Sequence, residues 1–233
     1  MPDWLPVVAW VYLIVCFLCA GMIAVHEFAR PQKMWIMNVV WPVNALYLGP
    51  LAVWAYWRWG RNTSGTAARS GHHGKEDMSE HKPFWVSAAI GTSHCGAGCT
   101  LGDIIAEWLM FALGLSFFGA MRHHDLFTAY VLDYAFAYVL GIAFQYFTIA
   151  PMRHLGLGAG LWAAIKADTL SLTAFEVGLF GWMALSSLVF FARPPGVTDP
   201  VYWFMMQLGM ALGFLTSYPV NVWLLKKGLK EKM

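Results

Sequence analysis

The sequence is short of charge. Asp, Glu, Lys and Arg make up only 12% of its 233 residues, about half of the roughly 25% that soluble domains carry. The few charged residues gather between long apolar blocks, a pattern typical of helices that cross a bilayer and are joined by polar loops. A chain of this length leaves no room for a sizeable soluble module, so we predict one transmembrane domain over residues 1–233.

Several signatures of function are also missing. The chain has no His-Glu-x-x-His pair, no nucleophile elbow and no phosphate-binding glycine loop, which disfavours hydrolases and nucleotide-driven pumps. Its few cysteines lie in or beside apolar segments, which excludes a secreted disulfide scaffold. The first apolar block follows Asp3 instead of Lys or Arg and is too long for a signal peptide, so we expect a retained first helix.

The apolar blocks that are present have the length of membrane spans, about 20 residues each. They cover residues 4–25, 34–57, 101–118, 126–149 and 201–225. A further span is expected within 155–192. Because Lys166 and Asp168 occur early in that stretch, we divide it into an interfacial lead-in at about 155–169 and a span at about 170–192. These blocks predict an all-α transmembrane bundle of about six spans.

The apolar stretch before the third span is shorter and rich in glycine. Gly91, Gly96 and Gly98 lie within 84–99, and glycine allows a chain to bend sharply. A re-entrant or broken segment fits this composition, provided that protein or a wet cavity covers its irregular backbone. A surface amphipathic helix that leads into the span fits it as well.

The distribution of Lys and Arg predicts the orientation. With six spans, one side of the membrane holds Arg58, Arg61, Arg69, Lys75, Lys82, Arg153, Lys226, Lys227, Lys230 and Lys232, and the other holds only Arg30, Lys33, Arg122 and Arg193. This predicts that both termini are cytoplasmic. Residues 61–82, rich in Gly, Ser and charge, are expected to form a flexible cytoplasmic loop.

The strongest chemical signal follows the glycine-rich stretch. In a helix, Cys95, Cys99, Asp103 and Glu107 fall four residues apart along one stripe, with His94 beside them. Thiolate and imidazole prefer Cu(I) or Zn to Mg or Ca, so these five residues are our candidate metal ligands. The same thiols could instead form a redox dithiol, although Cys-x-x-x-Cys is not the usual redox spacing, or they could simply pack as small apolar groups.

Further polar residues lie within apolar blocks and form a candidate pathway for protons or cations, because ionisable groups inside membranes tend to be functional. Two asparagines belong to a short internal sequence repeat, Trp-Pro-Val-Asn at 41–44 and Tyr-Pro-Val-Asn at 218–221. In each copy, Pro interrupts the backbone hydrogen bonds of the helix. The pathway residues are Asp133, Asp168, Glu176, Asn44 and Asn221.

These motifs resemble those of a family of bacterial and archaeal membrane proteins known only as a domain of unknown function. The resemblance is carried by the runs HCGAGCTLGDIIAE at 94–107, KADTLSL at 166–172, FGWM at 180–183 and TSYPVN at 216–221. The resemblance implies a membrane architecture. It also singles out the polar segments that contain the candidate ligands and pathway residues. It implies no established activity.

The sequence therefore predicts a prokaryotic inner-membrane protein that binds or transports a soft metal ion, copper first and zinc second. A membrane thiol-disulfide oxidoreductase and a non-catalytic assembly subunit are the alternatives, and an enzymatic activity is the less expected outcome. The expected partners are the lipid bilayer and the metal ion, with homo-oligomerisation left open and no nucleic acid.

Overall fold

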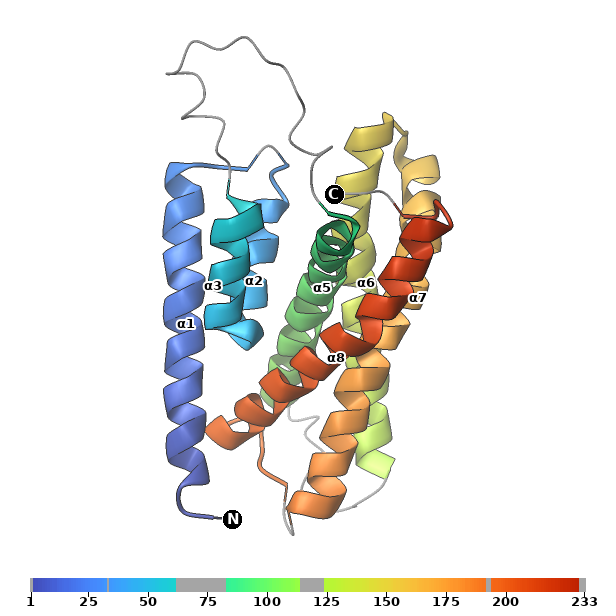
Figure 1. The fold of residues 1–233 in the computed structure, drawn as a ribbon. Helices are drawn as coiled ribbons and strands as arrows, with labels where there is room; N and C mark the ends of the chain where they lie inside the picture. The colour runs from blue at the N-terminus through green and yellow to red at the C-terminus, as the bar shows by residue number, and fades with distance from the viewer. Residues whose placement is uncertain (1, 33, 62–82, 114–123, 192–193, 231–233) are drawn as a thin grey trace.

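The computed structural model describes residues 2–32, 34–61, 83–113, 124–191 and 194–230, and within these ranges every regular element is a helix. Five helices are long and apolar enough to cross a membrane, which confirms the predicted all-α membrane architecture (Figure 1). They are α1 (Leu5–Ala29), α5 (Phe84–Ala112), α6 (His124–Arg153), α7 (Leu157–Leu185) and α8 (Pro200–Lys226). A π-helical turn, η3 (Ser186–Phe190), extends α7.

The predicted second span is folded into a helical hairpin. It consists of α2 (Met37–Leu48), α3 (Pro50–Ala55) and the π-helical turn η1 (Tyr56–Gly60). Gly49 joins the two arms with φ +53°, a left-handed conformation that favours glycine. The rings of Trp41 and Tyr56 lie 5.5 Å apart, whereas a continuous helix would separate these residues by about 22 Å. The chain therefore enters and leaves at the same end of the bundle (Figure 1).

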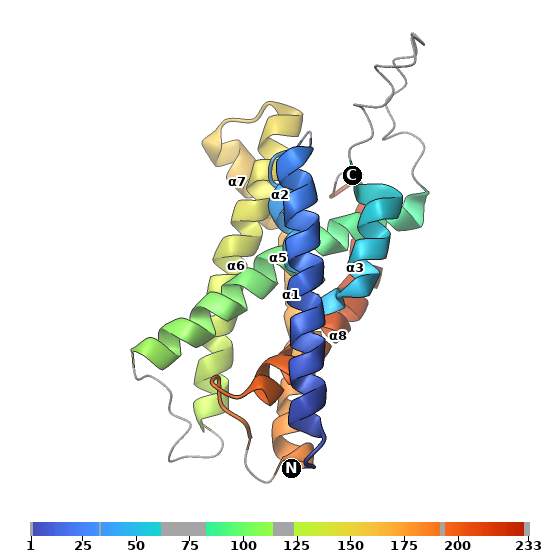
Figure 2. The same ribbon diagram turned by 90° about the vertical axis from the view of Figure 1, so that its left-hand side faces the viewer.

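The tip of this hairpin lies at mid-bundle. Tyr12 of α1 donates a hydrogen bond to the Tyr47 carbonyl (2.9 Å), and Gln207 of α8 donates one to the Leu46 carbonyl (2.6 Å). At the open end, Gln32 bonds the carbonyl of Gly60 (2.9 Å), so residues before α2 and after α3 meet again. Because this segment turns back, α1 begins and α8 ends at opposite ends of the bundle (Figures 1 and 2), whereas the sequence predicted a shared side for the two termini.

The segment 84–99 is neither re-entrant nor broken, since α5 is continuous through it. Gly98 in this segment, and Gly102 just after it, serve helix packing. A Cβ at Gly98 would lie 2.6 Å from the Gly141 Cα, and one at Gly102 would lie 2.4 Å from the Ala137 Cα. Small residues allow transmembrane backbones to approach closely, and here they bring α5 against α6.

The predicted division of 155–192 is also wrong, because α7 is one helix through Lys166 and Asp168. The two charges are accommodated differently: Lys166 is exposed, while Asp168 is buried against Lys230. The predicted loop at 61–82 lies, beyond Arg61, outside the described residues.

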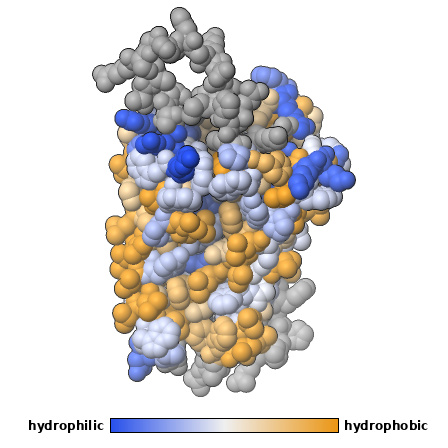
Figure 3. Space-filling view, in the orientation of Figure 1, coloured by the Kyte–Doolittle hydropathy of each residue, from blue (hydrophilic) through white to orange (hydrophobic). Residues whose placement is uncertain are grey.

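The bundle presents apolar side chains outward and surrounds α5. Many large apolar residues of α1 and α7 are exposed, and hydrophobic groups cover much of the flank seen in Figure 3. In contrast, α5 packs against α2, α6, α7 and α8. Helix α5 therefore carries its polar stripe into the interior.

Candidate functional site: a buried polar track

Helix α5 places its stripe of chemical groups inside the bundle. Cys95, Cys99, Asp103 and Glu107 are at most 4% exposed, although their four-residue spacing alone does not decide which neighbours they meet. Polar residues of α6, α7 and α8 line the same interior. We call this set the polar track: Lys230, Asp168, Asn221, Ser171, Ser217, Glu176, Cys95, Cys99, Asp103, Glu107, Asp133 and Tyr202.

One end of the track is built around an ion pair. Lys230 Nζ lies 2.8 Å from Asp168 Oδ1, and both side chains are 0% exposed. The same ammonium donates to Asn221 Oδ1 (2.8 Å) and to the Gly91 carbonyl (3.3 Å). It therefore joins α7, α8 and α5 at one level.

A small hydroxyl network continues this end of the track. The Asn221 amide donates to Ser171 Oγ (2.7 Å) and to Ser217 Oγ (3.0 Å), and the two hydroxyl oxygens lie 3.1 Å apart. Ser217 Oγ donates further to the Ser171 carbonyl (2.8 Å). These bonds fix α7 against α8 without help from Lys230.

The middle of the track holds the two thiols and Glu176. Neither cysteine forms a disulfide. Cys95, Glu176 and Asp103 lie close enough to Cys99 to interact electrostatically with its thiol group. No nitrogen or oxygen donor reaches the carboxyl group of Glu176 among the described residues, and its hydrogen-bonding neighbour is the Cys99 thiol. A carboxyl group and a dithiol thus share the centre of the bundle.

The other end is a cluster of three carboxyl groups. Glu107 hydrogen-bonds the Tyr202 hydroxyl and Asp133, and Asp103 has Glu176, Asp133 and Glu107 around it. Asp103 is 0% exposed and, within the described part of the chain, neither of its oxygens has a partner. Carboxylates this close repel unless a proton or a cation lies between them.

His94 does not join the thiols. Its Nε2 lies 3.1 Å from Thr148 Oγ1 of α6, and its ring packs edge-on against Phe144. One residue along a helix turns by about 100°, so His94 faces α6 while Cys95 faces the track. Among the described residues, no three His, Cys, Asp or Glu side chains come together as a metal-binding group.

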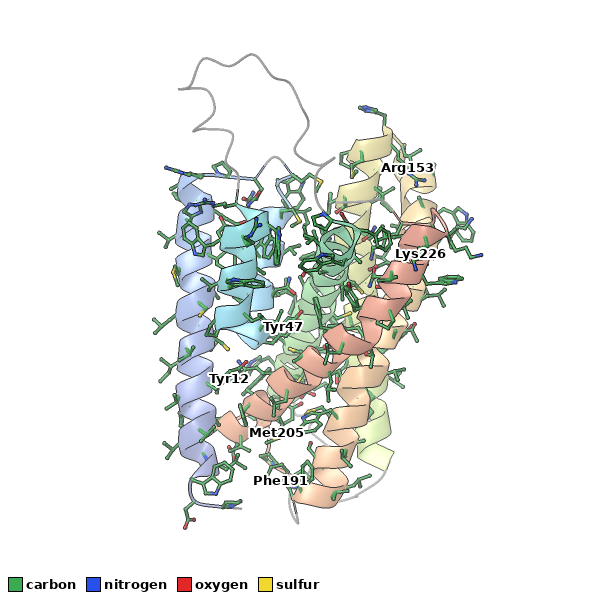
Figure 4. The ribbon with its side chains drawn as sticks, in the orientation of Figure 1. Tyr12, Tyr47, Arg153, Phe191, Met205 and Lys226 are labelled. Carbon is green, nitrogen blue, oxygen red and sulfur yellow. The ribbon has the colours of Figure 1, made fainter. Side chains whose placement is uncertain are left out.

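Of the two predicted asparagines, one belongs to the track and the other lies beside it. Asn221 contacts Lys230 and the serines, as above. Asn44 donates to the Ser93 carbonyl of α5 (2.9 Å) and accepts from the Tyr47 hydroxyl (2.5 Å). Tyr47, which Figure 4 labels near Tyr12 at mid-bundle, has Cys95 and Cys99 as neighbours. The hairpin therefore forms part of the wall around the thiols.

An apolar groove lies apart from the track. It has a volume of about 330 Å³ and separates α3 from α5 and α8. Trp41, Trp54, Trp59 and Trp85 line it together with leucines. Such a lining suits lipid chains better than ions.

Four members of the track are not among the predicted site residues. Ser171 and Ser217 lie within the runs KADTLSL and TSYPVN, but Lys230 and Tyr202 lie outside every motif. Lys230 counts as a loop charge in the sequence, because nothing there shows that the chain turns back after α8. Tyr202 stands near the start of an apolar block and carries no spacing signal. The nearest clue to Lys230 is Gly228, whose φ of +67° makes the reversal.

The helices and their buried ionisable groups define a polytopic membrane protein with a polar interior. Residues 84–230 match the model of the family described as domain of unknown function DUF4396, which covers more than half of the chain. The chain therefore belongs to this family, and the match includes every helix that contributes a residue to the track, from α5 to α8. No curated protein and no solved structure matches the chain.

Proposed function

We propose that this protein is a multi-pass membrane transporter that moves cations, protons included, through the bundle along the polar track. The observation that carries the proposal is the length of the track. From Gly91 to Glu107, α5 rises about 24 Å, most of the roughly 30 Å of a bilayer's hydrocarbon core. A structural role would not require ionisable groups at every level of that distance.

The unpaired carboxyl groups support transport over simple packing. A buried charge without a partner is strongly destabilising, and ionisable residues in membranes mark ion pathways and proton relays. Asp103 lacks a hydrogen-bond partner in the described residues, and Glu176 has only the Cys99 thiol beside it. A passing cation or proton would supply the missing partner at each step.

For the cargo we propose a soft metal ion, copper first and zinc second. Cys95 and Cys99 face the track at its middle, and thiolates prefer these ions to Mg or Ca. Asp103 and Glu107 would receive the ion on the side of the carboxyl cluster. His94 is held by Thr148 and would have to rotate to contribute, so we assign the thiols first.

The test is metal uptake into proteoliposomes. Wild-type protein should accumulate Cu(I) under anaerobic conditions, measured by mass spectrometry, and should carry near-stoichiometric metal when purified without chelator. The Cys95→Ser/Cys99→Ser variant should lose both, whereas Cys16→Ser/Cys19→Ser, with thiols on α1, should keep both. Equal uptake by the wild type and by the variant lacking Cys95 and Cys99 would exclude the thiols as ligands.

A redox function is the second candidate, favoured by the contact between the two thiols. A Cys95–Cys99 dithiol would open and close as a disulfide with a quinone or thiol partner. Alkylation of the thiols before and after reductant distinguishes this reading, since a transporter keeps both thiols reduced through its cycle. An assembly subunit, the third alternative, would instead co-purify with a partner and bind no metal.

We further propose the inner membrane of a prokaryote as the location, with the end of the bundle that holds Arg30, Arg61 and Lys226 in the cytoplasm. Arg153 and Lys226 are labelled together at this end in Figure 4. Asp3 and Asp199 precede α1 and α8 at the opposite end. The Lys and Arg bias of cytoplasmic loops supports this orientation, which leaves the start of the chain outside.

A further inference from the structure

Lys230 reaches the interior through a reversal of the chain. Helix α8 ends at Lys226, and Gly228 adopts φ +67°. The amide of Leu229 then bonds the Leu224 carbonyl (3.0 Å), and that of Gly228 bonds the Leu225 carbonyl (3.1 Å). This glycine-capped helix end directs Lys230 back into the bundle, where its side chain is fully buried.

The ammonium group of Lys230 sits in a cage of oxygen atoms. Its contacts are a carboxylate oxygen of Asp168, the amide oxygen of Asn221 and the Gly91 carbonyl. The second carboxyl oxygen of Asp168 is buried without a hydrogen-bond partner in the described chain. Carboxylate and carbonyl oxygens are the ligands that hard cations prefer.

We infer that the cage of Asp168, Asn221 and Gly91 is a binding site for a monovalent cation, and that the Lys230 ammonium is its tethered occupant. As long as Lys230 fills the cage, it closes the polar track at this end. A cation from solution must displace it to enter. The role in gating rests on the proposed transport function, whereas cation binding in the cage does not.

Charge balance selects a monovalent ion. The cage contains one carboxylate, which the single charge of the ammonium neutralises. A divalent ion would leave an uncompensated positive charge in a low-dielectric interior, at a large cost. Sodium, potassium, ammonium and small alkylammonium ions carry the charge that the cage is built to neutralise.

The cage does not depend on Lys230 for its shape. Asn221, Ser171 and Ser217 hydrogen-bond one another at 2.7–3.1 Å, which holds α7 and α8 together when the ammonium leaves. Lys230 itself comes from a turn beyond α8, on a flexible four-carbon stem. Its departure therefore breaks no helix.

The test is thermal unfolding of Lys230→Met protein in detergent, in the chlorides of potassium, sodium, ammonium or N-methylglucamine at equal ionic strength. N-methylglucamine is too large for the cage. The variant should melt below wild type in N-methylglucamine and rise by about 5 °C or more in a small cation near saturation. Wild type and Lys227→Met, which loses an exposed lysine, should show no such difference.

A double variant separates cation binding from general salt effects. Lys230→Met/Asp168→Asn removes both charges of the pair, so its melting temperature should be the same in all four salts. If Lys230→Met responds equally to all four, or if the double variant keeps the response to small cations, the inference is wrong. These outcomes leave the uptake experiment on wild-type protein unaffected, so the two proposals fail separately.

A second variant covers the case in which Lys230→Met does not fold. Lys230→Ala leaves room for a free alkylammonium ion in place of the lysine head group. Purification in propylammonium chloride should restore a monodisperse protein on size exclusion, and purification in N-methylglucamine chloride should not. Aggregation in propylammonium, potassium and sodium alike would overturn the inference.

Discussion

Asp103 offers the sharpest test of the track at the scale of a single residue. Its carboxyl group is fully buried and has no hydrogen-bond partner among the described residues. Its burial therefore weakens the folded state instead of supporting it.

We predict that Asp103→Asn melts at or above the temperature of the wild type while Cu(I) uptake falls at least about 10-fold. The asparagine amide keeps the shape of the side chain, but it can neither take up a proton from the pathway nor neutralise the charge of a bound cation. The control is Glu27→Gln, another buried carboxyl group, which lies outside the track and bonds Gln32. Glu27→Gln should retain uptake. A large loss of stability in Asp103→Asn with unchanged uptake would assign Asp103 a structural role.

The residues of the track show how much of the site the sequence pattern can predict. The four-residue spacing on α5 predicts one face for Cys95, Cys99, Asp103 and Glu107, because helical geometry alone determines it. Where that face points depends on tertiary packing. The His94 side chain faces α6 instead, where it hydrogen-bonds Thr148. The two residues are 54 positions apart, so no local sequence pattern predicts this hydrogen bond.

At the scale of elements, glycine marks different features in different helices. The close approach of α5 to α6 at Gly102 demands a residue without a side chain. We predict that Gly102→Ala lowers the free energy of unfolding by about 1–3 kcal/mol, the usual cost of overpacking, as measured by thermal or denaturant unfolding. The matched control is Gly181→Ala in α7, where a Cβ meets nothing within 4 Å. That change should be neutral or stabilising.

The hairpin tip provides a second test at this scale. Gly49 has a positive φ, and its Cβ would lie 3.1 Å from Cys16 Sγ. With ψ at −125°, Gly49 lies in a sparsely populated φ/ψ region where a residue with a side chain costs about 1–3 kcal/mol, so Gly49→Ala should lower the melting temperature. Gly158→Ala, in open space near the start of α7, is the control. Equal stability of the two variants would contradict the positive φ at the tip.

The glycines of α5 and of the hairpin explain why the sequence predicts a break in residues 84–99, although the bend lies at Gly49. Three glycines in 84–99 resemble a bend, yet a transmembrane helix tolerates them where a neighbouring helix packs closely. The actual bend is a Gly-Pro pair at 49–50, a dipeptide typical of turns. It lies in the middle of an apolar block whose total length equals that of one span. Length alone could not separate one crossing from a hairpin of two short arms.

At the scale of the whole molecule, the hairpin changes the topology. With 37–60 returning to its own side, Arg30 and Arg61 lie at the same end of the bundle, and five helices cross it. A sixth crossing in this segment would instead place the two arginines on opposite sides. The order of Lys and Arg along the chain fits the hairpin better, since α1, η1, α6 and α8 all end near basic residues.

We predict that cysteines introduced at Arg30 and Arg61 react with a membrane-impermeant maleimide only from the cytoplasmic side, and cysteines at Asp3 and Asp199 only from the outside. The background would be a variant in which all four native cysteines are serine. Labelling of intact cells against inverted vesicles provides the measurement, with membrane-permeant reagent as the control for reactivity. Reaction of the Arg30 and Arg61 sites from opposite faces would mean that 37–60 crosses the bilayer. In that case the hairpin could not close the wall around Cys95 and Cys99, and the track would need another covering element.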